Sequence, residues 1–432
     1  MFRNRRILYW GAVLLLIAAI DVMVLNNLHG KTSYLQLKIE SLLPKRKDIA
    51  AFGDVRVLIK SNGFAEITHT EVRFQSGSGL ILKSGEEMTE YPASEIITIT
   101  PEDERFEKGT IKIECKNNAG KINLQSIQRG YGVPSYRGTF ELFKTAEGIV
   151  IVNELPMEEY LYAVVPSEMP ASYEQEALKA QAVCARSYAY NQTRTYSYPE
   201  YQAHVDDSTS FQVYGNSKEQ ESTIRAVKET AGELLWYQDQ VATAYYYSTS
   251  CGTSASITAW GRKVNQNNQY LKSITICDEE GKIYEEDLPW YRWTATIPAE
   301  TLCELLEVNT GIEIGNLKSF AVTKQGEGGI AQQITAVGDS GEIVVETENK
   351  IRKALGGEGY TIEKQDGTVI NSTKLLPSAF FTVSKEEESY ILKGGGYGHG
   401  IGMSQNGANE MAKAGKTYRE ILTMFYSGVE IK

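Results

Sequence analysis

The sequence predicts an α+β protein: a mixed, β-rich region with a few helices, carried on a single N-terminal transmembrane anchor. Short runs with alternating or β-branched residues, such as VRVLIK at 55–60 and IITIT at 96–100, recur up to about residue 156 and predict strands. One long segment at 172–194 has its apolar residues at helical spacing. A single apolar run at 7–25 stands near the start of the chain and predicts the anchor.

The apolar run at 7–25 is about long enough to span a bilayer as a helix. The arginines before it predict a cytoplasmic tail at 1–6, because basic residues stay on the inner side. Residues 26–50 are polar and form an expected stalk, so 51–432 is expected outside the cell. A cleaved signal peptide is the alternative, but NNLHG after the run has no small-x-small pattern, which favours an uncleaved signal anchor. Asp21 inside the run carries a free-energy cost.

Composition excludes several classes of protein. The net charge is -11, and no basic patch follows the first six residues, which argues against nucleic acid as the main partner. The five cysteines are scattered without a CxxC pair, so neither a disulfide scaffold nor a CxxC-type zinc site is expected. The 26 tyrosines suit β-sheet surfaces and also suit a groove for a polar polymer.

The later segments predict further strands and short helices. A tyrosine-rich strand in ELLWYQDQVATAYYYSTSCGTSASITAWG leads into a loop of Ser, Thr and Gly. More strands are expected at 300–390, with one helix near 347–355. The chain closes with a glycine-rich loop, a helix at about 404–413 and a second helix after Thr417. Capping boxes are expected at Ser172 and at Thr417, each followed three residues on by Gln or Glu.

Glu168, in VVPSEMP, stands between two prolines just before the long helix. The prolines predict extended backbone around it and remove nearby N–H donors. Val165 and Met169 supply apolar surroundings, and partial burial raises the pKa of a carboxyl, which suits a general acid near neutral pH. The N-terminus of the next helix acts in the opposite direction and favours the anion. The structural alternative is a glutamate that caps that helix or forms a salt bridge with it.

His399 lies in the glycine-rich stretch GGGYGHGIGMSQ. Glycine lets a backbone adopt unusual angles and come close to a ligand. The imidazole is a candidate to orient a carboxylate, to bind substrate or to bind metal, and a packed structural histidine is the alternative. The stretch is not a phosphate loop, because no GK[ST] follows.

Cys251, in STSCGTSA, is a candidate nucleophile of a cysteine hydrolase if His399 acts as its base. The alternative is a loop that lines a cleft and carries an incidental cysteine.

Three long blocks of the chain resemble, in the same order, the stage II sporulation protein D family, which includes amidase-enhancer proteins of Gram-positive bacteria. The blocks read VNELPMEEYLYAVVPSEMPASYEQEALKAQAVCARSYA, AYYYSTSCGTSASITAWG and GGGYGHGIGMSQNGANEMAKAGKTYREILTMFYSGVEI. The resemblance spans about 54–432. It implies a peptidoglycan lytic transglycosylase, which cleaves glycan strands between N-acetylmuramic acid and N-acetylglucosamine. Sporulation members of the family are anchored in the membrane, act on peptide-stripped strands during engulfment and cooperate with an amidase–endopeptidase. For this chain the resemblance implies a Gram-positive membrane location, such as the mother-cell membrane facing the septal wall.

The resemblance assigns roles to residues of this chain. The Glu of the P-S-E-M-P motif is the catalytic acid in that family and corresponds to Glu168. Residues expected to bind substrate or to support Glu168 are Lys179, Gln181, Arg186, Tyr246, Ser250, His399, Ser404 and Gln405. Gly394 to Gly402 are expected to let their loop lie along the glycan, and Tyr245 to Tyr247 to provide a wall for stacking sugars, some of them facing the core. Helices are expected to line this glycan-binding groove.

Some members of that family carry a Cys/His pair before a Q-V-Y motif, linked to bound zinc. Here the segment reads AHVDDSTSFQVYG, with His204 but no nearby cysteine. The expectation is therefore no cofactor, and zinc on His204 and Cys251 would require the fold to bring those two together.

A lytic transglycosylase needs only one carboxylate, whereas ordinary glycosidases use two. Glu168 would protonate the glycosidic oxygen and then take the proton of the sugar's own C6 hydroxyl. Lys179, Arg186 or His399 would hold the carboxyl or the N-acetyl group. The alternative function is a non-catalytic glycan-binding protein that enhances a cell-wall amidase.

Overall fold

The structure is a computed structural model that describes residues 52–117 and 119–432. The predicted tail at 1–6, anchor at 7–25 and stalk at 26–50 all lie outside the described residues. Within the described part, no helix has the length and apolar character needed to cross a membrane. Helices and several sheets alternate through it, so the predicted α+β class is confirmed.

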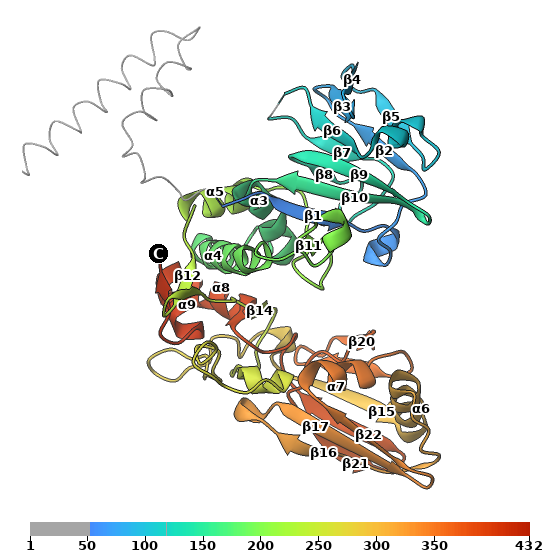
Figure 1. Cartoon of the computed structure of the whole chain (residues 1–432). Coiled ribbons are helices and arrows are strands. Elements are labelled where there is room, and N and C mark those ends of the chain that lie inside the picture. Colours follow the sequence, from blue (N-terminus) through green and yellow to red (C-terminus); the bar gives the residue numbers. More distant parts are fainter. Residues whose placement is uncertain (1–51, 118) are drawn as a thin grey trace, which may run out of the picture. The chain divides into compact units, whose positions relative to one another are not determined.

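Two sheets form the first part of the described chain (Figure 1). The larger has the order β11-β1-β10-β9-β6-β3-β4, and the smaller has the order β5-β2-β7-β8. The strands are β1 (Val55–Ile59), β2 (Val72–Gln75), β3 (Leu80–Ser84), β4 (Glu87–Tyr91), β5 (Ile96–Ile99), β6 (Ile111–Cys115), β7 (Ile122–Leu124), β8 (Ser135–Tyr136), β9 (Thr139–Thr145), β10 (Gly148–Leu155) and β11 (Val205–Asp206). Phe74 of the smaller sheet and Phe140 of the larger have ring centroids 5.2 Å apart, so the two inner faces meet in one core.

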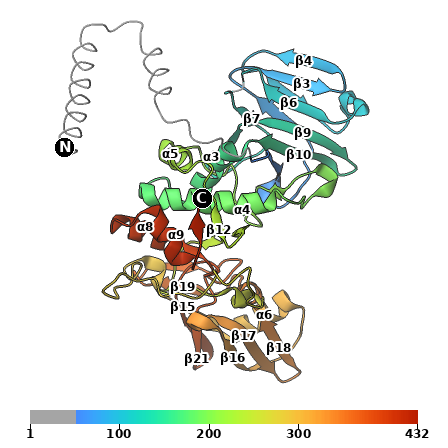
Figure 2. The same ribbon diagram turned by 60° about the vertical axis from the view of Figure 1, so that its left-hand side comes forward.

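The helix α4 (Gln175–Gln192) is the centre of the next layer, and α3 (Met157–Glu168), α5 (Glu221–Glu229), α8 (Gln405–Lys413) and α9 (Tyr418–Phe425) all pack on it (Figures 1 and 2). Its buried alanines allow these close approaches. The predicted capping box at Ser172 is wrong: the N-cap is Glu174 and makes no side-chain capping bond. The capping box at Thr417 is confirmed, with both of its reciprocal hydrogen bonds present.

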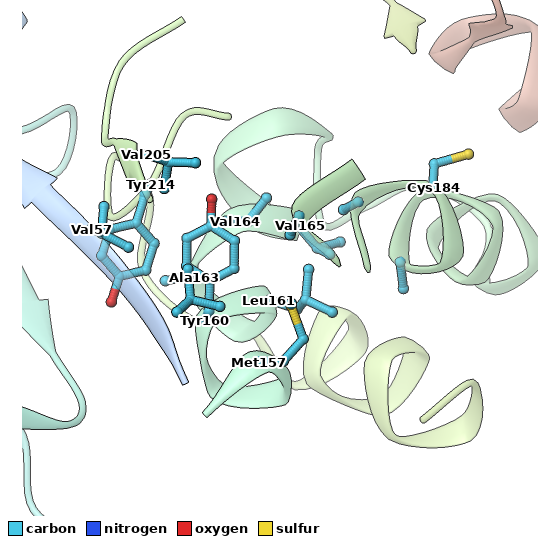
Figure 3. Packing of buried hydrophobic residues seen from close by; sticks show 14 of the residues in the cluster. Val57, Met157, Tyr160, Leu161, Ala163, Val164, Val165, Cys184, Val205 and Tyr214 are labelled. Atoms are coloured by element: carbon cyan, nitrogen blue, oxygen red, sulfur yellow. The ribbon is translucent and has the colours of Figure 1, made fainter. Parts of the chain in front are cut away.

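The backbone before Glu168 is helical, not extended as the flanking prolines predicted. Pro166 lies inside α3, and Glu168 is the last residue of that helix. The reason is packing: Tyr160, Leu161 and Val164 recur at helical spacing and are fully buried, which outweighs the local cost of a proline. Figure 3 shows these side chains in one cluster with Val57 of β1, Tyr214 and Cys184 of α4. Only Met169, directly before Pro170, is extended, as the rule for residues preceding proline expects.

Residues 293–394 build a second α+β region with its own core. Its five-stranded sheet has the order β20-β19-β15-β22-β21, and its three-stranded sheet has the order β16-β17-β18. The elements are β15 (Trp293–Pro298), α6 (Ala299–Thr310), β16 (Leu317–Gln325), β17 (Ala331–Gly338), β18 (Glu342–Glu346), α7 (Glu348–Ala354), β19 (Thr361–Lys364), β20 (Val369–Asn371), β21 (Phe381–Glu386) and β22 (Ser389–Gly394). The helix α7 matches the prediction near 347–355, whereas α6 was missed, although Leu302 and Leu306 have helical spacing and Gly311 ends the helix in the left-handed conformation.

The C-terminal block returns to the tyrosine-rich segment. The strand β14 (Tyr246–Tyr247) pairs in parallel with β23 (Met403–Ser404), and β12 (Leu235–Tyr237) pairs with both β13 (Gln240–Val241) and β24 (Glu430–Ile431). This pairing brings the three sequence blocks to one place, around the end of α3.

Candidate active site

Glu168 has the environment of a general acid. It is half-buried, and its Oε1 accepts a hydrogen bond of 2.6 Å from the backbone N–H of Val213. The Tyr246 hydroxyl hydrogen-bonds the same carboxyl. Burial raises the pKa of Glu168 to about 7, although both hydrogen bonds favour the anion and oppose this rise. A carboxyl with this pKa can both give and take a proton near neutral pH.

The proton of the Tyr246 hydroxyl is directed toward Glu168 by a buried glutamine. Gln212 Nε2 donates to the Tyr246 oxygen over 3.0 Å, and the Tyr160 hydroxyl donates to Gln212 Oε1 over 3.4 Å. Because the Tyr246 oxygen already accepts from Gln212, its O–H remains to serve as a donor to the carboxyl. Sequence reasoning considered the Q-V-Y motif only as a marker of a zinc site and so missed both Gln212 and the Val213 amide. The signal was present, since a polar side chain in an apolar run is either bonded or functional.

We expect Tyr246→Phe to raise the pKa of Glu168, because the carboxylate loses a donor that stabilises its charge. A hydrogen bond to a charged group is worth about 1.5–3 kcal/mol, so the shift should be about one pH unit or somewhat more. The measurement is the titration of Glu168 by NMR with a selectively labelled protein. The matched control is Tyr247→Phe, because the neighbouring Tyr247 hydroxyl is buried without a hydrogen-bond partner in the described structure. An equal Glu168 pKa in Tyr246→Phe and in the native protein would contradict this assignment.

Gln405 contacts the main chain at Glu168 and also contacts Gln181. Gln405 Nε2 donates to the Glu168 carbonyl over 3.1 Å and lies 3.4 Å from Gln181 Oε1. The fold therefore places Tyr246 and Gln405 in contact with Glu168, and Gln181 behind Gln405. Their roles toward a substrate stay predictions. The Gln181 side chain is fully buried, and its Nε2 has no partner among the described residues.

His399 supports Tyr246 and does not contact Glu168. Its Nδ1 accepts from the Ile401 N–H over 3.1 Å, and the ring hydrogen-bonds the backbone carbonyl of Tyr246. Nδ1 is thus unprotonated, and the other nitrogen, Nε2, carries the hydrogen. Burial, with a contribution from Arg352, lowers the pKa of His399 to about 3, so the imidazole is neutral. We assign it the role of fixing the strand that carries Tyr246.

The three residues of the expected tyrosine wall differ in burial. Tyr247 is buried, while Tyr245 and Tyr246 are half-buried. The ring of Tyr245 lies 6.1 Å from that of Tyr188 on α4 and 4.8 Å from that of Trp260. Tyr188 and Tyr245 are therefore the half-buried aromatic surfaces beside Tyr246.

Ser250 and Ser404 bind a second carboxylate that sequence reasoning missed. The Ser250 N–H and hydroxyl and the Ser404 hydroxyl all donate to Glu285, whose carboxylate is wholly buried. Burial raises the pKa of Glu285, and these donors oppose the rise. Ser404 also caps α8 by accepting from the Gly407 N–H over 3.1 Å. These serines join the Ser/Thr/Gly loop to the C-terminal block and do not bond to Glu168.

Lys179 and Arg186 point to the same side of α4, as the helical spacing predicted, but toward other partners than Glu168. The Lys179 ammonium lies 2.8 Å from carboxylate oxygens of Glu176 and Glu229. The Arg186 guanidinium is fully buried and forms a two-pronged ion pair with Glu158 at 2.8 and 2.7 Å. These contacts stabilise the packing of α4 against its neighbours.

The glycines of 394–402 pack against the protein itself. Gly396, Gly398, Gly400 and Gly402 all have positive φ. A Cβ on Gly402 would lie 2.0 Å from the Tyr245 carbonyl, and one on Gly400 would lie 2.5 Å from the Phe380 ring. Lack of a Cβ at these positions therefore allows close approach to other parts of the chain, including Tyr245 and Phe380. That the same loop lies along a glycan stays a prediction.

The fold does not bring His204 and Cys251 together as zinc ligands. His204 Nδ1 accepts from the Arg56 N–H, and its ring stacks on Tyr196 at 4.8 Å, whereas Cys251 lies beside Arg292. No group of three potential metal ligands occurs among the described residues. The Cys251 nucleophile is also unsupported, because burial raises the pKa of its thiol to about 11 and both nitrogens of His399 bond elsewhere.

Comparison with known proteins agrees with this geometry. A family model described as "Stage II sporulation protein" matches residues 145–237, which hold Glu168, Gln212 and Val213. The stage II sporulation protein D of Bacillus subtilis is 32% identical over 295 residues, covering 65% of this chain and 75% of that protein. The chain belongs to the stage II sporulation protein D family.

Other matches extend beyond that central block. The amidase enhancer of Bacillus subtilis is 29% identical over 365 residues, which cover 73% of this chain but only 49% of that protein, so the chain spans about half the length of this relative. An uncharacterized protein of Brachyspira hyodysenteriae is 32% identical over 302 residues, covering 68% of this chain and 72% of that protein. A second model, described as a domain of unknown function (DUF8618), matches residues 245–402, which include the second α+β region.

Proposed function

We propose that this family member is a peptidoglycan lytic transglycosylase that uses Glu168 alone as acid and then as base. The observation that carries the proposal is the Glu168 carboxyl, half-buried, with a pKa of about 7 and two fixed donors. The relatives named for sporulation and for amidase enhancement support a role at the cell wall.

In the first step, protonated Glu168 donates its proton to the glycosidic oxygen, and the bond from C1 of N-acetylmuramic acid to that oxygen breaks. The Val213 N–H and the Tyr246 O–H stabilise the carboxylate that forms. In the second step, the C6 hydroxyl of the same sugar bonds to C1, and Glu168 takes its proton. The products are a 1,6-anhydro end and a free hydroxyl on the leaving sugar. No water enters, so no second carboxylate is needed to activate one.

The test is product analysis of residues 52–432 with peptide-free glycan strands. Mass spectrometry should detect ends lighter by one water than hydrolysed ends with the native protein and not with Glu168→Gln. If the native protein instead produced ends with the mass of hydrolysed sugar, the reaction would be a hydrolysis and the proposed mechanism would be wrong. Full cleavage by Glu168→Gln would refute the role of Glu168.

A non-catalytic glycan-binding protein that enhances a cell-wall amidase is the second candidate, favoured by the name of one relative. The discriminating measurement adds a purified cell-wall amidase and its wall substrate. Equal amidase stimulation by the native protein and Glu168→Gln, with strands bound and no new ends from either, would favour this candidate.

We further propose that the chain is held by its N-terminal segment in the cell membrane with its C-terminal region outside, where it cooperates with a cell-wall amidase or endopeptidase during engulfment. The three arginines before the apolar run at 7–25 support this location. Protease added to intact protoplasts should remove the C-terminal region and leave a short membrane-bound stub.

A further inference from the structure

The second α+β region carries an elongated groove away from Glu168. One part is a cavity of about 600 Å³ that Cys251, Arg292, Trp293, Phe381 and Lys393 help to line. A second cavity of about 380 Å³ lies between β16 and β21. Both are lined by Gln325 and Thr382, so they adjoin and form one channel along the two strands.

The guanidinium of Arg292 is held in a fixed orientation at one end of this groove, with two N–H groups that are free, among the described residues, to bind a ligand. Its Nη1 donates to the carbonyls of Cys251 at 3.0 Å and Tyr291 at 2.7 Å. The guanidinium also lies over the Tyr291 ring, 3.8 Å from its centroid. These contacts fix the plane of the group, while Nε and Nη2 make no hydrogen bond within the described structure. That pair of N–H groups matches the two oxygens of a carboxylate.

The charge of the groove is opposite to that of the whole chain. The lining includes Arg292, Lys393 and Lys324 and no acidic residue, in a protein of net charge -11. Arg292 and Lys393 have no carboxylate within ion-pair distance among the described residues. Two uncompensated cations at one end of a groove favour a ligand with a negative end.

The walls of the groove suit an extended peptide. Within residues 52–117 and 119–432, β16 pairs only with β17, and β21 pairs only with β22, so each strand has an edge without a strand partner there. Edge strands offer alternating N–H and C=O groups, which match a peptide backbone better than a sugar or phosphate chain. The two ends of the groove differ in charge. At the start of β21, Thr382 lies opposite Lys393, so this end is basic. At the other end of the strand, Glu386 is followed by two more glutamates, so that end is acidic.

We propose that this groove binds an extended peptide about six residues long, with its free C-terminal carboxylate held by Arg292 and Lys393. The chain of the peptide then lies along β21, which has six residues, with its amino end toward Glu386. Trp293 and Phe381 form an apolar floor beneath the last side chain. This binding does not depend on the chemistry of Glu168.

The experiment is calorimetric titration of the described region with a pool of unlabelled hexapeptides, threonine alternating with alanine, valine or isoleucine. One pool has free carboxyl termini, and the other has amidated termini. We expect binding of the first pool with an affinity at least tenfold above that of the second. Arg292→Gln and Lys393→Gln should each reduce the affinity about tenfold, whereas Lys350→Gln, an exposed lysine on α7, should leave it unchanged.

Lys393→Gln protects the test against misfolding, because Lys393 is exposed and makes no side-chain bond within the described structure. Equal affinity for free and amidated peptides would overturn the proposal, as would binding that survives both groove variants or no heat with either pool. Binding of a glycerol-phosphate oligomer or of peptide-free glycan in place of the peptides would also overturn it, since either would assign the groove to another polymer.

Discussion

Glu168→Gln is expected to lower the rate of glycan-strand cleavage by about 10²–10⁴-fold, the usual contribution of a general acid. The amide retains the shape of the side chain and can still accept from the Val213 N–H, but it cannot deliver a proton. The measurement is the initial rate of formation of anhydro ends at pH 6. Glu159→Gln, which removes the same charge from the same helix, is the control and should keep the native rate.

The same substitution should stabilise the fold at neutral and alkaline pH. The pKa of Glu168 is raised in the folded state from 4.5 to about 7. Between these values the unfolded chain ionises first, so the native protein loses stability as pH rises from about 4.5 to about 7. The free energy of unfolding of Glu168→Gln, minus that of the native protein, should therefore be about 1–3 kcal/mol larger at pH 8 than at pH 4. This range includes a discount for the partial exposure of the side chain. This measurement shows whether a loss of activity in Glu168→Gln comes from the missing acid or from misfolding, because a misfolded variant would be less stable than the native protein at pH 8.

The pH dependence of cleavage follows from the same pKa. The first step needs the protonated carboxyl, so the rate should fall about tenfold per pH unit above pH 7. A native rate that is flat from pH 6 to pH 9 would contradict the assignment of Glu168 as the acid.

Features of this chain that depend on residues close in sequence were predictable, whereas features that depend on packing between distant segments were not. The long helix α4 and the capped α9 follow from apolar spacing and a local capping pattern. The helix α3 was misjudged because Pro166 gives a strong local signal, whereas the packing that outweighs it comes from β1 and from Tyr214, distant in sequence.

The candidate site shows the same division. Glu168 was singled out from its sequence motif, although the flanking prolines misled about its backbone, and the structure places Tyr246 and Gln405 in contact with it. The Val213 amide was not predictable, because a backbone donor has no side-chain signature. Glu285 was also missed, since a single glutamate in the acidic stretch DEEGKIYEEDLPW looks like any solvated charge until Ser250 and Ser404 are seen around it.

Glu158→Ala is expected to destabilise the fold by about 3 kcal/mol, the largest stability effect we predict. Arg186 is wholly buried, and Glu158 is its only carboxylate partner among the described residues, so the substitution leaves an uncompensated charge in the core. Two carbonyls, those of Val227 and Glu233, still accept from the guanidinium at 3.2 Å, which keeps the cost at the lower end of the range for broken buried pairs. Urea unfolding followed by circular dichroism measures the effect.

Lys179→Gln is the matched control, because it removes a cation from the same face of α4 whose ion pairs are partly solvated. It should change the free energy of unfolding by less than about 1 kcal/mol. Replacing the whole pair, in Glu158→Leu with Arg186→Met, should restore most of the stability, since no buried charge remains unpaired. If Arg186 instead bound the substrate, the double variant would have native stability but would not cleave glycan strands. In that case Glu158→Ala would unfold at the same urea concentration as the native protein. Helical spacing placed Lys179 and Arg186 on one face of α4, but burial separates their expected effects on stability. Arg186 is buried between α4 and α3, and through its ion pair with Glu158 it helps to fix the position of Glu168 at the end of α3.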